Sequence, residues 1–146
     1  MIEDLVSVQA TIAASPQQLF DLVCDPALHP VIDGSGSVRA ARPGNPQRLA
    51  LGSTFGMDMH IILGYKIVNT VVEFEEGHLI AWQHFYGHRW RYIFDPVDAG
   101  TLVTEQWDAR PSRGRVALGL LGYPARNRVG ITKSLVRLAD LAAASA

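Results

Sequence analysis

Five segments with strand character follow one another between residues 54 and 108, and this succession narrows the possible folds more than any other feature. Each alternates apolar with polar side chains or forms a short apolar run bounded by turn residues, which is typical of β-strands. Because a parallel pair needs a crossover of about a dozen residues, strands joined by tight turns pair antiparallel. The segments are Thr54–Met59, Tyr65–Phe74, Leu79–Phe85, Arg89–Phe94 and Leu102–Asp108.

Further strands and helices flank this succession. Leu5–Ile12 alternates as a half-buried strand does, and Ser37–Ala41 predicts a short strand. Between them, Ser15-Pro16 supplies an N-cap and a helical first turn, and the helix that follows ends before Pro26. A second helical turn is expected over Ala27–Val31, and a short helix over Val116–Leu121. From Pro124 to Ala142 apolar residues recur at helical spacing, which predicts a final helix of about 22 residues, roughly 33 Å long.

This order predicts an α+β fold with a curved seven-stranded antiparallel sheet, two short helices after the first strand, and a long C-terminal helix across the sheet. The apolar face of such a sheet needs a cover, which the last helix supplies. A gap between a curved sheet and a single helix is where a small-molecule site forms. Because 146 residues suit one domain and no repeat or linker divides them, we expect a single domain over 1–146.

Composition excludes several classes of protein. With 48% hydrophobic and 18% charged residues, the chain does not have the composition of a disordered protein. Cys24 is the only cysteine, which excludes an intramolecular disulfide and a cysteine-based zinc site. The sequence contains no run of about 18 apolar residues, so no membrane span is predicted. The acidic start Met1–Asp4 is unlike a signal peptide, so a cytoplasmic protein is expected.

The net charge of -1 conceals an uneven distribution. Residues 1–108 hold six Lys or Arg against thirteen Asp or Glu, whereas residues 109–146 hold seven Lys or Arg against Asp140 alone. Such a division either marks an anionic partner or reflects a solvated helix face whose charge complements the rest of the chain. The pI of about 6.5 and the absence of a known binding module argue against nucleic acid.

Alternation along the strands assigns side chains to faces. Phe55, Met57 and Met59 share one face of their strand, and Trp90, Tyr92 and Phe94 share one face of theirs; both sets are expected to point inward. In the last strand, Val103, Glu105 and Trp107 share a face, but both faces are mixed, so its orientation stays open. An inward Glu105 is a buried carboxyl group suited to acid–base chemistry. An outward Glu105 would pair with Arg89 or Arg91.

The five histidines do not predict a metal site. His84 and His88 have the spacing of some zinc ligands but bracket a turn at Gly87, and no third ligand lies near them in the sequence. They are expected either in solvent or at the mouth of a pocket, where neutral histidine can transfer a proton near pH 7. No dinucleotide, phosphate-loop, nucleophile-elbow or zinc-protease motif occurs, so no cofactor is expected.

Several short sequence segments resemble those of the START-like (SRPBCC) superfamily, in particular of its polyketide cyclase/dehydrase-type members. The resemblance covers nearly the whole chain and implies the helix-grip fold, in a family that includes aromatic cyclases, lipid carriers and receptors. One departure is Ile32-Asp33-Gly34, where many relatives carry a tryptophan, and it implies a differently shaped pocket entrance. The matching segments are Ala14–Phe20, Asp25–Pro30, Leu51–Phe55, Val72–Glu75, Leu79–Trp82 and Gly100–Glu105.

The sequence is therefore compatible with three functions. The first is binding of a small hydrophobic or aromatic molecule in an internal cavity; its expected contacts are Phe55, Met57, Met59, Trp90, Tyr92, Phe94, Val103 and Trp107. The second is a cyclase or dehydratase in the same cavity, with Glu105, Tyr65, His84 and His88 as catalytic candidates, and Arg91 only if its strand is turned the other way. The third is an interaction protein that uses the basic C-terminal segment. A homodimer stays open.

Overall fold

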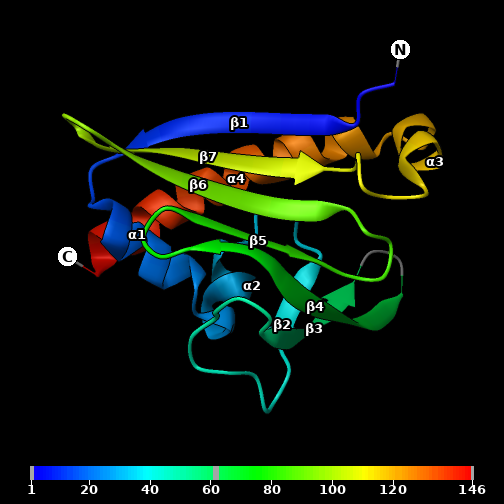
Figure 1. Cartoon of the computed structure of the whole chain (residues 1–146), viewed down its shortest axis with the longest axis horizontal. Coiled ribbons are helices and arrows are strands. Elements are labelled where there is room, and N and C mark those ends of the chain that lie inside the picture. Colours follow the sequence, from blue (N-terminus) through cyan, green and yellow to red (C-terminus); the bar gives the residue numbers. More distant parts are fainter. Residues whose placement is uncertain (1, 61–62, 146) are drawn as a thin grey trace.

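A computed structural model describes residues 2–60 and 63–145, and its strands form one antiparallel sheet. The strand order is β1-β7-β6-β5-β4-β3-β2, so every hairpin neighbour in the sequence is a neighbour in the sheet and β1 is added beside β7. Figure 1 shows the sheet curling in front of α4, which runs behind β1 and β7. The strands are β1 (Leu5–Ile12), β2 (Val38–Ala41), β3 (Thr54–His60), β4 (Gly64–Glu75), β5 (Leu79–Gln83), β6 (Arg89–Val97) and β7 (Gly100–Asp108).

The helices lie close to their predicted ranges. The Ser15 hydroxyl accepts a hydrogen bond from the Gln18 backbone N–H at 3.1 Å and opens α1. Gly122, at a φ of 82° that favours glycine, turns the chain into α4. The helices are α1 (Pro16–Val23), the 3-10 turn η1 (Pro26–Leu28), α2 (His29–Ile32), α3 (Arg115–Leu120) and the 22-residue α4 (Tyr123–Ala144).

The expected architecture is thus confirmed, with small differences at the element ends. β5 ends at Gln83 rather than at Phe85, because the chain leaves the ladder before the turn at Gly87. β6 runs on to Val97, so Pro96 lies in a strand, next to its end, where the hairpin to β7 closes. The loop of the β5–β6 hairpin is therefore longer than the sequence indicates, and His84 and His88 lie in it, outside both strands.

One hydrophobic core fills the space between α1, α4 and the sheet. Phe20 of α1 packs edge-on against Phe74 and Phe94, with ring centroids 5.5 and 5.8 Å away. Cys24 is buried beside this cluster, and desolvation raises the pKa of its thiol to about 12, so the thiol is unreactive near neutral pH. The largest fully buried side chains include Trp107, Phe20, Phe55, Phe94, Leu19 and Leu49.

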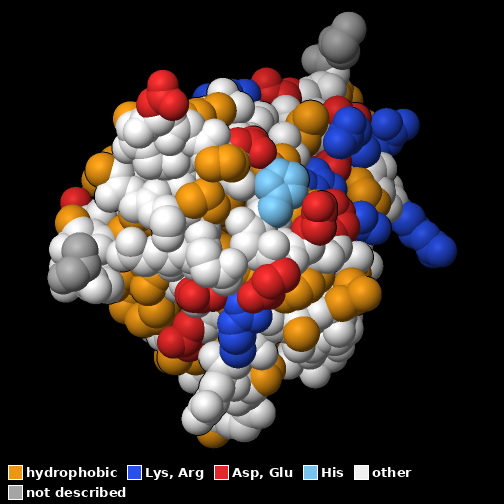
Figure 2. Space-filling model, turned by 60° about the vertical axis from the view of Figure 1, so that its left-hand side comes forward, with side chains coloured by type: hydrophobic (Ala, Val, Ile, Leu, Met, Phe, Trp, Pro, Cys, Tyr) orange, Lys and Arg blue, Asp and Glu red, His pale blue; other side chains and the backbone are white. Residues whose placement is uncertain are grey.

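Basic side chains of the C-terminal segment contact acidic residues of the same chain. Arg115 and Arg128 lie 3.4 and 2.9 Å from carboxylate oxygens of Asp4 and Glu3, which precede β1. Arg110 pairs with Asp108 at 2.8 Å. On the face shown in Figure 2, acidic and basic side chains likewise lie beside one another. These pairs support the alternative in which the basic segment complements the acidic part of the chain.

Candidate functional site

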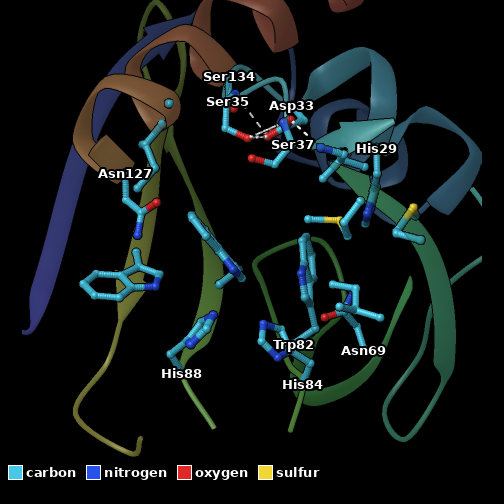
Figure 3. Close-up of a pocket in the computed structure, with 18 of the residues that line it drawn as sticks. His29, Asp33, Ser35, Ser37, Asn69, Trp82, His84, His88, Asn127 and Ser134 are labelled. Atoms are coloured by element: carbon cyan, nitrogen blue, oxygen red, sulfur yellow. Dashed lines mark hydrogen bonds between the residues drawn. The ribbon is translucent and has the colours of Figure 1, made fainter. Parts of the chain in front are cut away.

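A pocket of about 520 Å³ lies between the concave face of the sheet and the helices α2 and α4. Its volume falls in the range of small-molecule sites, about 300–1,000 Å³. Figure 3 shows side chains from α2, α4 and the strands converging on it. Much of its wall is aromatic or aliphatic, including Met57, Met59, Trp82, Trp90, Trp107 and Ile131.

Four buried polar atoms have no hydrogen-bond partner within the described part of the chain, and all four belong to residues that line this pocket. They are Asn69 Oδ1, His84 Nδ1, His88 Nδ1 and Glu105 Oε1. Buried polar atoms are satisfied in the large majority of cases, and leaving one unpaired costs about 1–3 kcal/mol. Their gathering around one cavity distinguishes this pocket from the rest of the core.

Glu105 faces inward, which settles the open orientation of β7. It lies opposite Tyr92 of β6, and both side chains are buried and line the pocket. Desolvation by burial raises the pKa of Glu105 well above its usual value; the Tyr92 hydroxyl opposes that shift and the charge of Asp33 adds to it. Glu105 is therefore a protonated acid over a wider pH range than an exposed glutamate.

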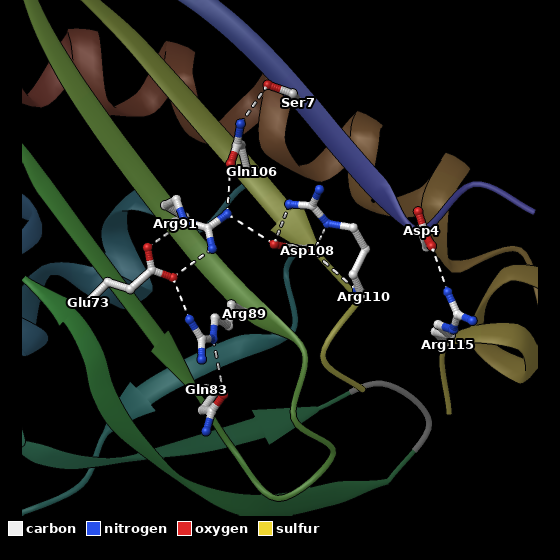
Figure 4. Close-up of polar contacts among 10 residues, drawn as sticks. All are labelled: Asp4, Ser7, Glu73, Gln83, Arg89, Arg91, Gln106, Asp108, Arg110 and Arg115. Atoms are coloured by element: carbon white, nitrogen blue, oxygen red, sulfur yellow. Dashed lines mark hydrogen bonds and ion pairs between the residues drawn. The ribbon is translucent and has the colours of Figure 1, made fainter. Parts of the chain in front are cut away.

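The outward pairing of Glu105 with Arg89 or Arg91 is thus excluded, and both arginines have other partners (Figure 4). Glu73 of β4 accepts hydrogen bonds from Arg89 at 2.8 Å and Arg91 at 2.6 Å. Arg91 also contacts Asp108 at 3.2 Å. Arg91 lies on the outer face of the sheet, which removes it as a catalytic candidate.

His84 and His88 lie at the tip of the β5–β6 hairpin, with ring centroids 4.5 Å apart. The turn at Gly87, with a φ of 84°, bends both rings back to the pocket, so they are not solvent-exposed turn residues. Desolvation lowers the pKa of both, and that of His88, lowered further by His84, falls to about 4. Both rings are therefore neutral near pH 7.

The α2–β2 loop forms a second polar wall. The Asp33 carboxylate accepts hydrogen bonds from the backbone N–H and hydroxyl of Ser35 and from the N–H of Val38. The Gly34 N–H donates to the Ser134 hydroxyl of α4 at 2.8 Å, which fixes the loop against the helix. The segment 32–34, expected to reshape the entrance, therefore places a carboxylate on the wall of the pocket.

Most of the residues expected at the site line the pocket. They are Met57, Met59, Trp90, Tyr92 and Trp107 among the ligand contacts, and Glu105, His84, His88 and the exposed Tyr65 among the catalytic candidates. Phe55, Phe94 and Val103 point inward as expected but do not line the pocket. Phe20 covers Phe94, and His29 covers Phe55 at a centroid distance of 5.2 Å, so these side chains belong to the core beneath.

Other lining residues were not singled out in the sequence. The His29 ring donates a hydrogen bond to the Val23 carbonyl over 2.8 Å and stacks on Trp82 with centroids 4.8 Å apart. Burial lowers the pKa of this ring, which favours its neutral form. Asn69, Asn127 and Ser134 line the pocket from β4 and α4. Only alternation along β4 and helical spacing along α4 point to these three positions.

No group of three or more His, Cys, Asp or Glu side chains in the described ranges is placed to hold a metal ion. Among the helices that the structure describes, none is long and apolar enough to cross a membrane.

The curled sheet and the single long helix across it define a helix-grip protein. Residues 4–143 match the family described as "Polyketide cyclase / dehydrase and lipid transport", and the chain belongs to this family. The resemblance seen in the sequence is therefore confirmed over nearly the whole chain.

Two curated relatives come from Mycobacterium tuberculosis. Uncharacterized protein Rv0088 of strain H37Rv is 36% identical over 145 residues, and uncharacterized protein MT0096 of strain CDC 1551 is 35% identical over 145 residues. Each match covers 92% of this chain but 62% of the relative, so the chain spans less than two thirds of their length. The single domain expected over 1–146 stays a prediction.

Solved structures share the fold at low identity. An AHSA1-like protein from Aeromonas hydrophila superposes with a TM-score of 0.71 at 18% identity, covering 97% of this chain and 93% of that one. Protein Ms6760 from Mycobacterium smegmatis gives 0.70 at 16%, covering 98% and 93%. The Aha1 dimer from Colwellia psychrerythraea gives 0.67 at 14%, covering 93% of each. These similarities establish the helix-grip architecture.

Proposed function

We propose that the protein binds a small, largely apolar or aromatic molecule in the pocket between the sheet and α4. The observation that carries this proposal is the coincidence of the cavity with the four unpartnered polar atoms. An apolar wall with a few converging polar groups is typical of ligand sites, where the polar groups orient the ligand. The family's description, which includes lipid transport, supports the same conclusion.

The aromatic side chains suit a planar ligand. Trp82 stacks with both His29 and Tyr92, with ring centroids 4.8 and 5.9 Å away and interplanar angles of 25° and 30°. Such rings offer flat apolar surface, and aromatic pairs contribute about 0.5–1.5 kcal/mol beyond area burial. A planar ligand inserted beside this stack gains contact area with several rings at once.

Binding is tested with native mass spectrometry of freshly purified protein and with fluorescence titration of the neutral probe N-phenyl-1-naphthylamine. Asn127 projects from α4 into the pocket (Figure 3), so Asn127→Trp should fill the cavity and weaken probe binding by at least ~10-fold. Val136→Trp places the same side chain on the exposed side of α4 and should leave binding unchanged. Equal probe affinity in both variants would contradict the proposal.

A second candidate is a cyclase or dehydratase-type enzyme in the same pocket. The observation that favours it is the convergence of Glu105, Tyr92, His84 and His88, since a carrier needs only one or two polar anchors. A neutral histidine can remove a proton from carbon next to a ligand carbonyl, while protonated Glu105 donates to the carbonyl oxygen. Glu105→Gln should then lower kcat on a poly-β-keto substrate by ~10²-fold or more while the substrate still binds. Turnover unchanged in that variant would exclude Glu105 as the acid.

The remaining expectations stay predictions. These are docking through the basic C-terminal segment, a homodimer and a cytoplasmic location. A dimer is described for the Aha1 protein of Colwellia psychrerythraea, which shares the fold. Docking by exposed charge would weaken between low and high salt, because screening acts over about 8 Å at physiological ionic strength.

A further inference from the structure

We propose that Glu105 makes this pocket selective for uncharged ligands that present a carbonyl or similar acceptor oxygen, and that carboxylates of the same shape are excluded. This inference rests on the proposed binding function and names the chemical class of its ligand. It concerns which ligands enter, independently of whether they react.

One oxygen of Glu105 has no hydrogen-bond partner. The residue is 4% exposed, and Oε1 is without a partner among the described residues. Because burial favours the neutral acid, Glu105 carries a proton that it can donate. A ligand carbonyl at this position accepts that hydrogen bond without introducing a charge.

The described residues that line the pocket include no buried cation that could receive an anion. Among the lining residues that the structure describes, Arg126 is the sole Lys or Arg; its side chain is exposed, with the guanidinium 4.2 Å from the centre of the Tyr123 ring. His29, His84 and His88 are neutral near pH 7, because desolvation lowers the pKa of each. A carboxylate moved from water into this space loses its hydration without gaining a counter-charge.

The carboxylate of Asp33 also lines the pocket. It accepts its hydrogen bonds from Ser35 and Val38, and its charge acts on both Glu105 and Tyr92. A second negative charge in the same pocket would be repelled by it, because like charges at close range repel one another. Asp33 and Glu105 therefore both oppose an anionic ligand.

In any experiment that varies the pH, the titration of Glu105 must be distinguished from that of the other groups facing the pocket. Those that shift the pKa of Glu105 itself are Tyr92 on β6 and Asp33 after α2. The other titratable or charged residues facing the pocket are His29 on α2, Tyr65 on β4, His84, Tyr86 and His88 on the β5–β6 hairpin, and Tyr123 and Arg126 on α4. The Glu105→Gln variant retains all of them, so a difference between it and the wild type reports Glu105 alone.

The test compares two ligands on one scaffold, 2-acetylnaphthalene and 2-naphthoate, by isothermal titration calorimetry at about pH 7, where the second is ionised. The ketone should bind at least ~10-fold more tightly than the carboxylate. As the pH rises, the ketone affinity of the wild type should fall as Glu105 loses its proton, whereas that of Glu105→Gln, whose amide still donates, should not change. Val136→Trp, a control on the exposed side of α4 that keeps the acid, should preserve the preference for the ketone.

The outcomes separate the two proposals. If both ligands bind equally, or if the carboxylate binds more tightly, the selectivity is refuted while the binding function stands. If neither binds, the binding function is itself contradicted. The ranking and pH profile of the wild type need no variant, so the inference stays testable if Glu105→Gln does not fold; circular dichroism decides that point.

Discussion

Glu105 on β7 lies directly opposite Tyr92 on β6, and both side chains point into the pocket rather than into water. This pair places an acid and a phenol side by side in a region of low polarity. Burial raises the pKa of both groups, so both are neutral over a wide pH range. Most of the polar groups that line the pocket are therefore neutral, and the charge of Asp33 acts on both Glu105 and Tyr92.

The first prediction concerns the stability of Glu105→Gln. Because the pKa of Glu105 is raised on folding, its contribution is complete below the unfolded pKa of about 4.3 and is lost as the pH rises through the folded pKa. As the pH rises above about 4, the free energy of unfolding of the variant should therefore increase relative to that of the wild type. Urea unfolding across this range measures it. Glu105→Met removes the same titration and should show the same trend; parallel pH curves for wild type and both variants would refute the raised pKa.

The second prediction concerns Asp108, whose side chain is 4% exposed and pairs with Arg110 and Arg91. Hydrogen bonds from Arg110 and Arg91 lower the pKa of Asp108 to about 2. Its contribution is present above the unfolded pKa of 3.8 and is lost as the pH falls through about 2. Asp108→Asn should cost about 2 kcal/mol near neutral pH, and the loss should shrink in acid.

Chemical denaturation at a series of pH values measures this difference. Asp58→Asn is the matched control, because Asp58 pairs with Arg42 at 3.2 Å while both side chains remain more than a third exposed. An exposed pair contributes about 0–1 kcal/mol. If Asp108→Asn loses no more stability than the control, the ion pairs of Asp108 with Arg91 and Arg110 contribute little to the free energy of unfolding.

The third prediction concerns the close contact between the α2–β2 loop and α4. A Cβ atom at Gly34 would lie 2.5 Å from the Ser134 backbone nitrogen and 2.6 Å from the Gly130 carbonyl oxygen. Gly34→Ala should therefore push the loop from the helix, lower stability by about 1–3 kcal/mol and weaken probe binding. Thermal unfolding and the probe titration measure both effects.

Gly64→Ala is the control for this substitution, since its nearest atom would be 3.9 Å away and no positive φ is required there. It should change stability by less than about 0.5 kcal/mol. If Gly34→Ala behaves like the control, the loop and helix are not tightly packed, and the wall that carries Asp33 is not held in place as described.

Much of the fold follows from local patterns. The alternation in β3 and β6 assigns Met57 and Tyr92 to inward faces because each strand has one clearly apolar side. The cap at Ser15 and the glycine at position 87 place a helix start and a turn, since both act through the backbone within a few residues. Such signals do not depend on distant parts of the chain.

The site was only partly predictable, because its residues become neighbours through long-range packing. Asp33 and Asn127 lie far apart in the sequence and meet at the pocket when α4 closes over the sheet. Phe55 and Phe94 point inward as expected, yet they contact His29 and Phe20 instead of lining the cavity. Alternation predicts the side of the sheet on which a residue lies, but not what covers it.

The order of the elements, the antiparallel pairing and the strand faces with a single apolar side can be predicted from the amino-acid sequence, because they depend on nearby residues and on backbone geometry. The inward direction of Glu105 and the return of His84 and His88 to the pocket depend instead on packing between distant segments. Both faces of β7 are mixed, so its orientation follows from the outer pairing of Arg91 with Glu73 and Asp108 and from the cover that α4 provides. Contacts between segments that are distant in the sequence stabilise these polar groups in their positions. Local sequence patterns do not predict such contacts.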